Sequence, residues 1–220
     1  MSKTTIPSGG LGGGLPSSLT VGSAVAEDTK IVFDGNAQDY HIGLDDSVDD
    51  LVIGKGSALG TTANIVIDEA GCVTKPLQPA FLAVNEGSDS ITNATETTIA
   101  LDTEIFDVNG DVSSNTFTAP VTGRYAFQYH VQINDISTQD SGTYYYIEIN
   151  TSNRVFYELS SINAAIGSSS GQNYFCFTGS VTADMDASDT CNLRVVMGGT
   201  SGTGPSDIST NSHFSGHLVC

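Results

Sequence analysis

An alternation of large apolar and polar side chains near the middle of the chain constrains its fold more than any other feature. Every second position from 125 to 133 holds an apolar residue, namely Tyr125, Phe127, Tyr129, Val131 and Ile133. Polar side chains stand between them at Arg124, Gln128, His130 and Gln132. Successive side chains of a β-strand point to opposite faces, so this period of two predicts a long strand with one face in a core.

Further β-type runs follow this strand and precede it, at residues 80–84, 97–106, 115–119, 143–150, 154–160, 173–182, 191–198 and 213–219. The segments between them are rich in Gly, Ser, Asn and Asp, which tolerate the backbone angles of tight turns. The chain has 24 glycines and no stretch of helical periodicity. We therefore expect an all-β chain, nearly free of helix, whose residues 77–220 form an antiparallel sandwich head.

Residues 29–76 hold shorter runs, at 30–35, 39–45, 50–56 and 64–71. So few residues make a weak core and leave strand edges open. Three intertwined copies would close the edges and bury the apolar side chains of the segment around a threefold axis. These side chains are Ile31, Phe33, Ile42, Leu44, Leu51, Ile53, Ile65 and Ile67. The segment is predicted to be a short trimeric β shaft, with Ile31, Phe33 and Ile53 in the interface between subunits.

Residues 1–28 form a Gly/Ser/Pro/Thr-rich arm with almost no charge. Such a segment buries too little apolar surface to fold alone. Scattered apolar residues, from Ile6 to Val21, favour a docking peptide over a plain tether, although both interpretations stay open. Thr4, Thr5, Ile6, Pro7 and Leu11 are the predicted docking residues. No charged segment followed by an apolar one opens the chain, which argues against a secretion signal.

The segment from residue 29 through the stretch IVIDEAGCVTKPLQPAFLA, which ends at residue 83, resembles the junction between shaft and head in tail-fibre and other appendage proteins of marine bacteriophages. Within the head, the pattern F-x5-G-x-Y-x-F-x-Y is formed by Phe117, Gly123, Tyr125, Phe127 and Tyr129. It resembles the signature of complement component one q globular heads, which share the tumour necrosis factor jelly roll. Near the C-terminus, Phe214 and Gly216 resemble the closing strand of that family.

This resemblance implies a jelly-roll head that assembles as a homotrimer and binds through apical loops. The loops at residues 139–142, 167–172 and 198–204 are the expected contact surface. Tyr144 and Tyr146 stand opposite the predicted core residues of their strand, and we place them at the subunit interface, with ordinary surface tyrosines as the alternative. Phe106, Asn109 and Asp111 follow the first half of the signature, but their spacing differs by about one residue.

Charge and motif content exclude several classes of function. Seven basic against 25 acidic residues give a net charge of −18, so DNA, RNA and anionic membranes are unfavourable partners. No apolar run is long enough to span a membrane. The G-x-S-x-G match at residues 167–171 lacks the strand and helix that a nucleophile elbow needs. A capsule-degrading activity is disfavoured because the chain has no Trp platform.

No cofactor or catalytic residue is predicted. Cys72, Cys176, Cys191 and Cys220 lack metal-ligand spacing. Cys191 fits a buried apolar position, and a disulfide from Cys176 to Cys191 has no support in the pattern. The acidic pairs at 45–46 and 49–50 fit solvated turns better than a calcium loop.

The sequence thus favours a virion structural protein: a trimeric phage fibre whose head contacts the host surface. The expected partners are two further copies of the chain, another virion protein that receives the arm, and a host cell-surface molecule. The expected location is the virion, outside the cell after host lysis. A capsid-surface fibre or decoration trimer with a purely structural role is the alternative.

Overall fold

The structure is a computed structural model that describes residues 20–87, 89–91, 95–134, 144–161, 174–198 and 206–220. These residues form strands and turns and contain no helix. None of the described elements is therefore a helix that could cross a membrane. The chain divides into two compact units, Met1–Pro76 and Leu77–Cys220. The predicted all-β class is confirmed.

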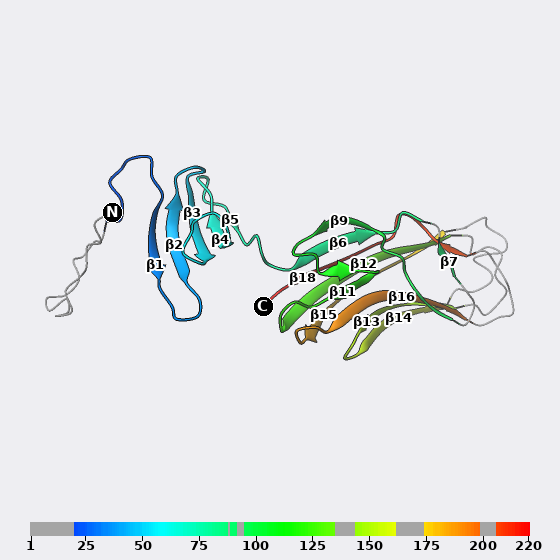
Figure 1. Ribbon diagram of the computed structural model, residues 1–220. Helices are drawn as coiled ribbons and strands as arrows, with labels where there is room; N and C mark the ends of the chain where they lie inside the picture. The colour runs from blue at the N-terminus through cyan, green and yellow to red at the C-terminus, as the bar shows by residue number, and fades with distance from the viewer. Residues whose placement is uncertain (1–19, 88, 92–94, 135–143, 162–173, 199–205) are drawn as a thin grey trace. The chain divides into compact units, whose positions relative to one another are not determined.

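The first unit is a five-stranded antiparallel sheet in which each strand pairs with the next along the chain (Figure 1). Its strands are β1 (Thr29–Phe33), β2 (Tyr40–Asp45), β3 (Asp50–Lys55), β4 (Ala63–Ile67) and β5 (Val73–Thr74). All four runs expected in this segment form strands. Within one chain these strands pair with one another, and the expected intertwining of three copies stays a prediction.

One face of the first sheet is closed by its own chain. His41 is fully buried, and its Nδ1 lies 2.8 Å from the carbonyl oxygen of Gly56. Gly54 leaves room for this ring, since a Cβ there would lie 2.7 Å from two imidazole atoms. Leu59 lies over Gly43, where an added Cβ would be 2.9 Å from its Cδ2. The loop after β3 thus covers the part of this face that holds His41, Gly43 and Gly54.

The second unit is a sandwich of two antiparallel sheets (Figure 1). One sheet contains β8 (Glu96–Thr98), β10 (Val112–Ser113), β11 (Thr116–Thr118), β13 (Tyr144–Thr151), β14 (Val155–Ser161) and β16 (Thr190–Gly198). The other contains β6 (Ala80–Val84), β7 (Asp89–Ser90), β9 (Thr103–Asp107), β12 (Gly123–Asn134), β15 (Tyr174–Met185), β17 (Asp207–Ile208) and β18 (His213–Leu218). The predicted jelly-roll sandwich is confirmed.

The long strand predicted from the alternation is β12, the centre of its sheet. It pairs with β15 along its whole length, and on its other side with β18 and then β17. β18 in turn pairs with β6, so the first and last long strands of the sandwich are neighbours. Every apolar residue of the alternation is at most 7% exposed.

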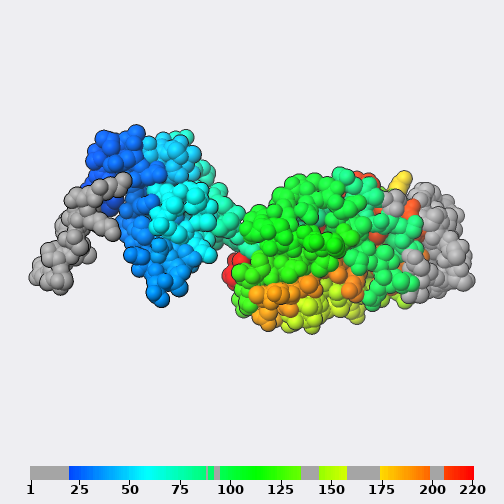
Figure 2. Space-filling model, viewed as in Figure 1, coloured from blue at the N-terminus to red at the C-terminus, as the bar shows by residue number. Residues whose placement is uncertain are grey.

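The core lies between the two sheets and is rich in aromatic rings. Phe117 of β11 stacks on Phe81 of β6, with 5.1 Å between ring centroids, and therefore joins the two sheets. Phe127 and Phe214 stack at 5.6 Å. Such pairs stabilise beyond the apolar area that they bury. In the space-filling view, the side chains of each unit form a continuous packed body (Figure 2).

The run at residues 97–106 is not one strand, and this expectation was wrong. β8 pairs with β16 in one sheet, whereas β9 pairs with β6 in the other. The chain crosses between the sheets at residues 99–102, where Ile99 and Leu101 are buried. Both ends of the run are β-type in composition, and only the crossing separates them.

Candidate binding surfaces

The aromatic pattern around β12 serves the core rather than a ligand. Phe117, Tyr125, Phe127 and Phe214 are at most 2% exposed, and Tyr129 is 7% exposed. Tyr125 donates a hydrogen bond from its hydroxyl to the carbonyl oxygen of Val121, 2.8 Å away. This bond fixes the corner where the chain enters β12. The motif residues thus build the sandwich on which the surface groups stand.

Two histidines stack on the outer face of the sheet that contains β12. His130 of β12 and His213 of β18 are cross-strand partners, and their ring centroids lie 5.4 Å apart. They line a shallow depression of about 660 Å³ together with Gln128, Tyr129, Thr178, Gly179, Ser180 and Ser215. The lining is mostly hydroxyl, amide and imidazole groups, which suits a polar ligand that exchanges hydrogen bonds. The sequence predicted an outward position for His130, but its contact with His213 depends on the strand register.

A cluster of tyrosines lies on the outer face of the other sheet. Tyr144 and Tyr146 of β13 stack in parallel at 6.1 Å between centroids, and Tyr157 of β14 lies 5.9 Å from Tyr146. Tyr144 is 37% exposed and Tyr157 is 68% exposed. Gly198 leaves space for the side chain of Tyr144, since a Cβ at position 198 would lie 2.5 Å from the tyrosine ring. Tyr157 was not singled out in the sequence, and only its pairing opposite β13 reveals it.

A partly buried carboxyl group lies beside the tyrosine cluster. Glu148 of β13 is 7% exposed. Burial raises the pKa of its carboxyl above the ordinary value, Glu96 raises it further, and Arg194 lowers it. Arg194 donates a hydrogen bond to Glu96 at 2.9 Å, so its charge is shared between two acids. The same face thus offers aromatic edges, a guanidinium and carboxyl groups.

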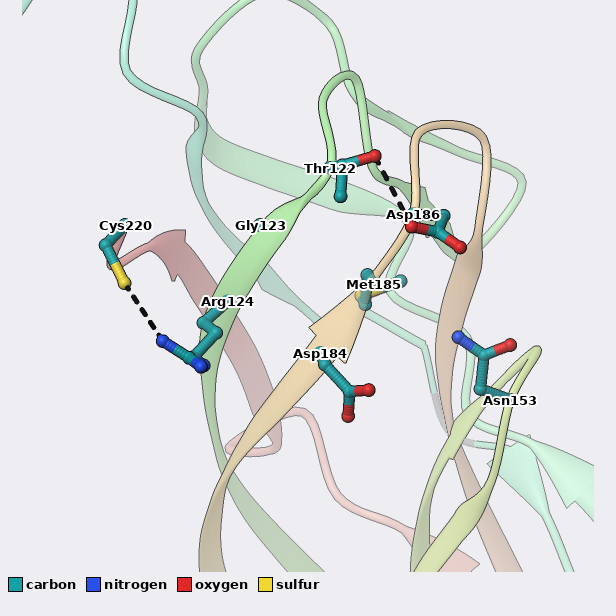
Figure 3. A pocket seen from close by; sticks show the side chains of 8 residues that line it. All are labelled: Thr122, Gly123, Arg124, Asn153, Asp184, Met185, Asp186 and Cys220. Atoms are coloured by element: carbon teal, nitrogen blue, oxygen red, sulfur yellow. Dashed lines mark hydrogen bonds between the residues drawn. The ribbon is translucent and has the colours of Figure 1, made fainter.

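A third surface lies at the corner that precedes β12 (Figure 3). This pocket of about 280 Å³ is lined by Thr122, Gly123, Arg124, Asn153, Asp184, Met185, Asp186 and Cys220. Arg124 donates from Nη1 toward the sulfur of Cys220 at 3.8 Å, and Thr122 donates to Asp186 at 3.5 Å. The pocket is lined by one guanidinium, of Arg124, and two carboxylates, of Asp184 and Asp186, so it has no single sign of charge.

The predicted interface residues lie on exposed faces of both units. Ile31 is 44% exposed and Phe33 is 56% exposed, while Ile53 is half-buried on the same face. Tyr146 is half-buried in the tyrosine cluster. Their assignment to a subunit interface stays a prediction. The docking residues Thr4, Thr5, Ile6, Pro7 and Leu11 lie outside the described residues, as do 139–142, 167–172 and 199–204 of the expected contact loops.

Cysteine and acidic side chains do not gather into a metal site in the described part of the chain. There, no three His, Cys, Asp or Glu side chains lie close enough to share a metal ion. All four cysteines are free. Cys191 is buried, as expected, and burial raises the pKa of its thiol. Cys176 is exposed on β15, in the opposite sheet, so a disulfide between these two would not join neighbouring strands.

Comparison with known proteins gives likenesses of fold alone. No protein-family model matches the chain, and no curated protein matches it. Among solved structures, the globular domain of the zebrafish complement 1qA protein is similar over 65% of this chain and 98% of its own, with 14% identity and a TM-score of 0.46. Murine APRIL at pH 8.0 is similar over 64% of this chain and 98% of its own, with 12% identity and a TM-score of 0.44. At this level neither likeness establishes assembly or function, and the sandwich rests on the strand pairing described above.

Proposed function

We propose that the chain is the subunit of a trimeric phage fibre whose sandwich head contacts the host surface. One observation carries this proposal: the chain links a well-packed sandwich to a small sheet, and one face of that sheet is apolar and uncovered. A self-sufficient monomer has no use for such a face, whereas a subunit of an appendage needs a surface of this kind.

The partners follow from the division of the chain. Copies of the same chain complete the fibre, and residues 1–28 bind another virion protein through Thr4, Thr5, Ile6, Pro7 and Leu11. A host cell-surface molecule binds the head. The net charge of −18 disfavours nucleic acid and anionic lipid as ligands. The site of action is the virion after its release from the host.

Three copies of a weak contact surface bind one cell with high avidity, because the second and third contacts form at high effective concentration. The outer faces of the head offer two kinds of contact. The histidine depression presents hydrogen-bonding groups, and the tyrosine cluster presents aromatic edges beside Glu148 and Arg194. Both suit a polar surface polymer better than a membrane.

Competition for adsorption tests the host-binding role. Purified full-length protein, added in excess, should reduce the adsorption of the phage that carries it to host cells. A double variant, His130→Ala with Tyr157→Ala, probes the two outer faces while leaving the core motif intact. The unrelated surface substitution Val48→Ala is the matched control.

Two results would contradict the proposal. If the phage adsorbs to host cells as well with saturating purified protein as without it, the host-contact role is refuted. If those phage particles carry normal fibres, the protein is then a purely structural trimer. Normal decoration of particles by a chain that lacks residues 2–20 would remove the docking role of the arm.

A further inference from the structure

The strand register of the first unit gathers its large apolar side chains on one face. Directly paired residues of an antiparallel sheet share a face. One row across β1 to β4 is therefore Ile31, Ile42, Ile53 and Ile65, and a second row across β2 to β5 is Leu44, Leu51, Ile67 and Val73. Phe33 of β1 and Tyr40 of β2 are also direct partners and lie on the same face, next to the first row. We call these ten residues the apolar face.

The apolar face is open in a single chain. Seven of its side chains are between 37% and 60% exposed, namely Ile31, Phe33, Tyr40, Ile42, Leu44, Leu51 and Val73. On the opposite face the loop after β3 covers the buried His41 and Val52, and Val32, at 38%, is the one exposed large apolar side chain among the described strand residues of that face. The sheet has therefore placed its bulky residues on the side that its own described residues do not cover.

Charge distribution suits this face to burial. In the described part of this unit, the carboxylates lie in turns, before β1 or at strand ends, as at Asp34, Asp39 and Asp45–Asp46. Lys55, paired with Tyr40, is the one charged residue whose register places it on the apolar face, at its corner. Two such faces can meet without removing a carboxylate from water, which would cost several kcal/mol.

The size of the face matches a specific interface. Ten large side chains, seven of them roughly half exposed, offer on the order of 700 Å² of apolar surface, and a standard interface buries about 800 Å² per partner. A second copy of the chain supplies an identical apolar surface with the same freedom from buried charge. An anionic membrane offers no matching apolar surface at the level of its headgroups and would meet the negative field of the whole chain.

We propose that the apolar face is the self-association surface of the first unit and packs face to face against the same face of other copies. The contact is made by side chains of complete sheets, because each strand from β1 to β5 already pairs within its own chain. Only the number of copies, three, rests on the proposed function. The first unit is thus a second point of assembly, separate from the head.

Photo-crosslinking of the full-length protein identifies the occupant of the face. p-Benzoylphenylalanine in place of Ile42 should give a two-chain product on illumination. Mixing with isotopically labelled, unmodified chains should map the new bond to the apolar face of the other copy. The same group in place of Val48, which is 56% exposed in the turn after β2, should give little two-chain product.

Bonds found only within one chain, for instance to residues 1–19, would overturn the proposal, as would the absence of any two-chain product. A second position, Leu51, repeats the test if the first variant folds poorly. The chain has no tryptophan, so Ile42→Trp also reports burial through a blue-shifted emission, with Val48→Trp as the exposed reference. A protein that crosslinks as expected but does not compete for adsorption would retain this inference and refute the host-contact role.

Discussion

Glu148 is the residue whose environment most clearly opposes its charge. Its pKa is raised by burial first and by Glu96 second, and Arg194 offsets this only in part. A carboxyl with a raised pKa holds its proton more tightly in the folded than in the unfolded chain. Protonation of this carboxyl therefore raises the free energy of unfolding as the pH falls from neutral through the folded-state pKa. The gain is complete once the pH is below the ordinary value of 4.5.

Glu148→Gln should accordingly raise the Tm at pH 7 by a few degrees, and the gain should vanish near pH 4.5. Thermal unfolding at both values measures the difference. Glu104→Gln, a substitution of an exposed glutamate on β9, should leave the Tm almost unchanged at either pH. A gain from Glu148→Gln that is equal at both pH values would show that charge is not the cause.

Gly216 lies where two aromatic rings close on the backbone of β18. A Cβ at this position would lie 2.6 Å from Phe127 Cδ1 and 2.8 Å from Phe81 Cε1. Gly216→Val should destabilise the head by about 1–3 kcal/mol through overpacking. The midpoint of urea unfolding measures this loss. Ser215→Val, on the opposite face of the same strand, should have a small effect, and equal losses would contradict the packing argument.

At the scale of elements, the hairpin of β10 and β11 fixes the crossing between the sheets. Ser114 and Asn115 form its two-residue turn with φ of 50° and 64°. The side-chain oxygen of Asn115 also accepts the backbone N–H of Leu101, at 2.8 Å, within the crossing. One residue thus supports both the turn and the change of sheet.

Asn115→Gly should cost about 1 kcal/mol, because it keeps the turn but loses the bond to Leu101. Asn115→Ala should cost roughly 1 kcal/mol more, since alanine resists a positive φ. Chemical unfolding of the two variants gives the order. Equal stability of both would show that the backbone angle contributes nothing.

Several elements were predictable from sequence because their pattern repeats locally. The alternation in β12 fixes its inner face without knowledge of its neighbours, and the turn residues mark most strand ends. The crossing at residues 99–102 was missed, since its buried Ile99 and Leu101 look like a continuation of a strand. Which strands pair is a long-range property, so the contact of His130 with His213 and the place of Tyr157 could not be read from the chain.

The same limit applies to the first unit. The apolar residues of β1 to β4 were recognised as interface candidates, but the strand register that gathers them on one face with Val73 of β5 could not be read from the chain. Gly43 and Gly54 lie on the other face beside the buried His41, where the loop after β3 covers the sheet.

At the scale of the whole molecule, charge opposes assembly and apolar surface favours it. With a net charge of −18 per chain, the proposed trimer carries three times −18, or −54. Screening extends over about 30 Å at 0.01 M salt and about 10 Å at 0.1 M. Added salt should therefore strengthen the association of full-length chains, as measured by sedimentation equilibrium at a series of salt concentrations. Weakening by salt would instead indicate an interface made of ion pairs.

The pairing of β6 with β18 has a consequence for how such a chain can change. The backbone N–H of Leu218 donates to the carbonyl oxygen of Pro79 at 2.9 Å, so the chain enters and leaves the sandwich at the same place. The sandwich can therefore be exchanged as a whole for another whose outer strands adjoin in the same way. Its sequence can then diversify while that of the first unit is preserved.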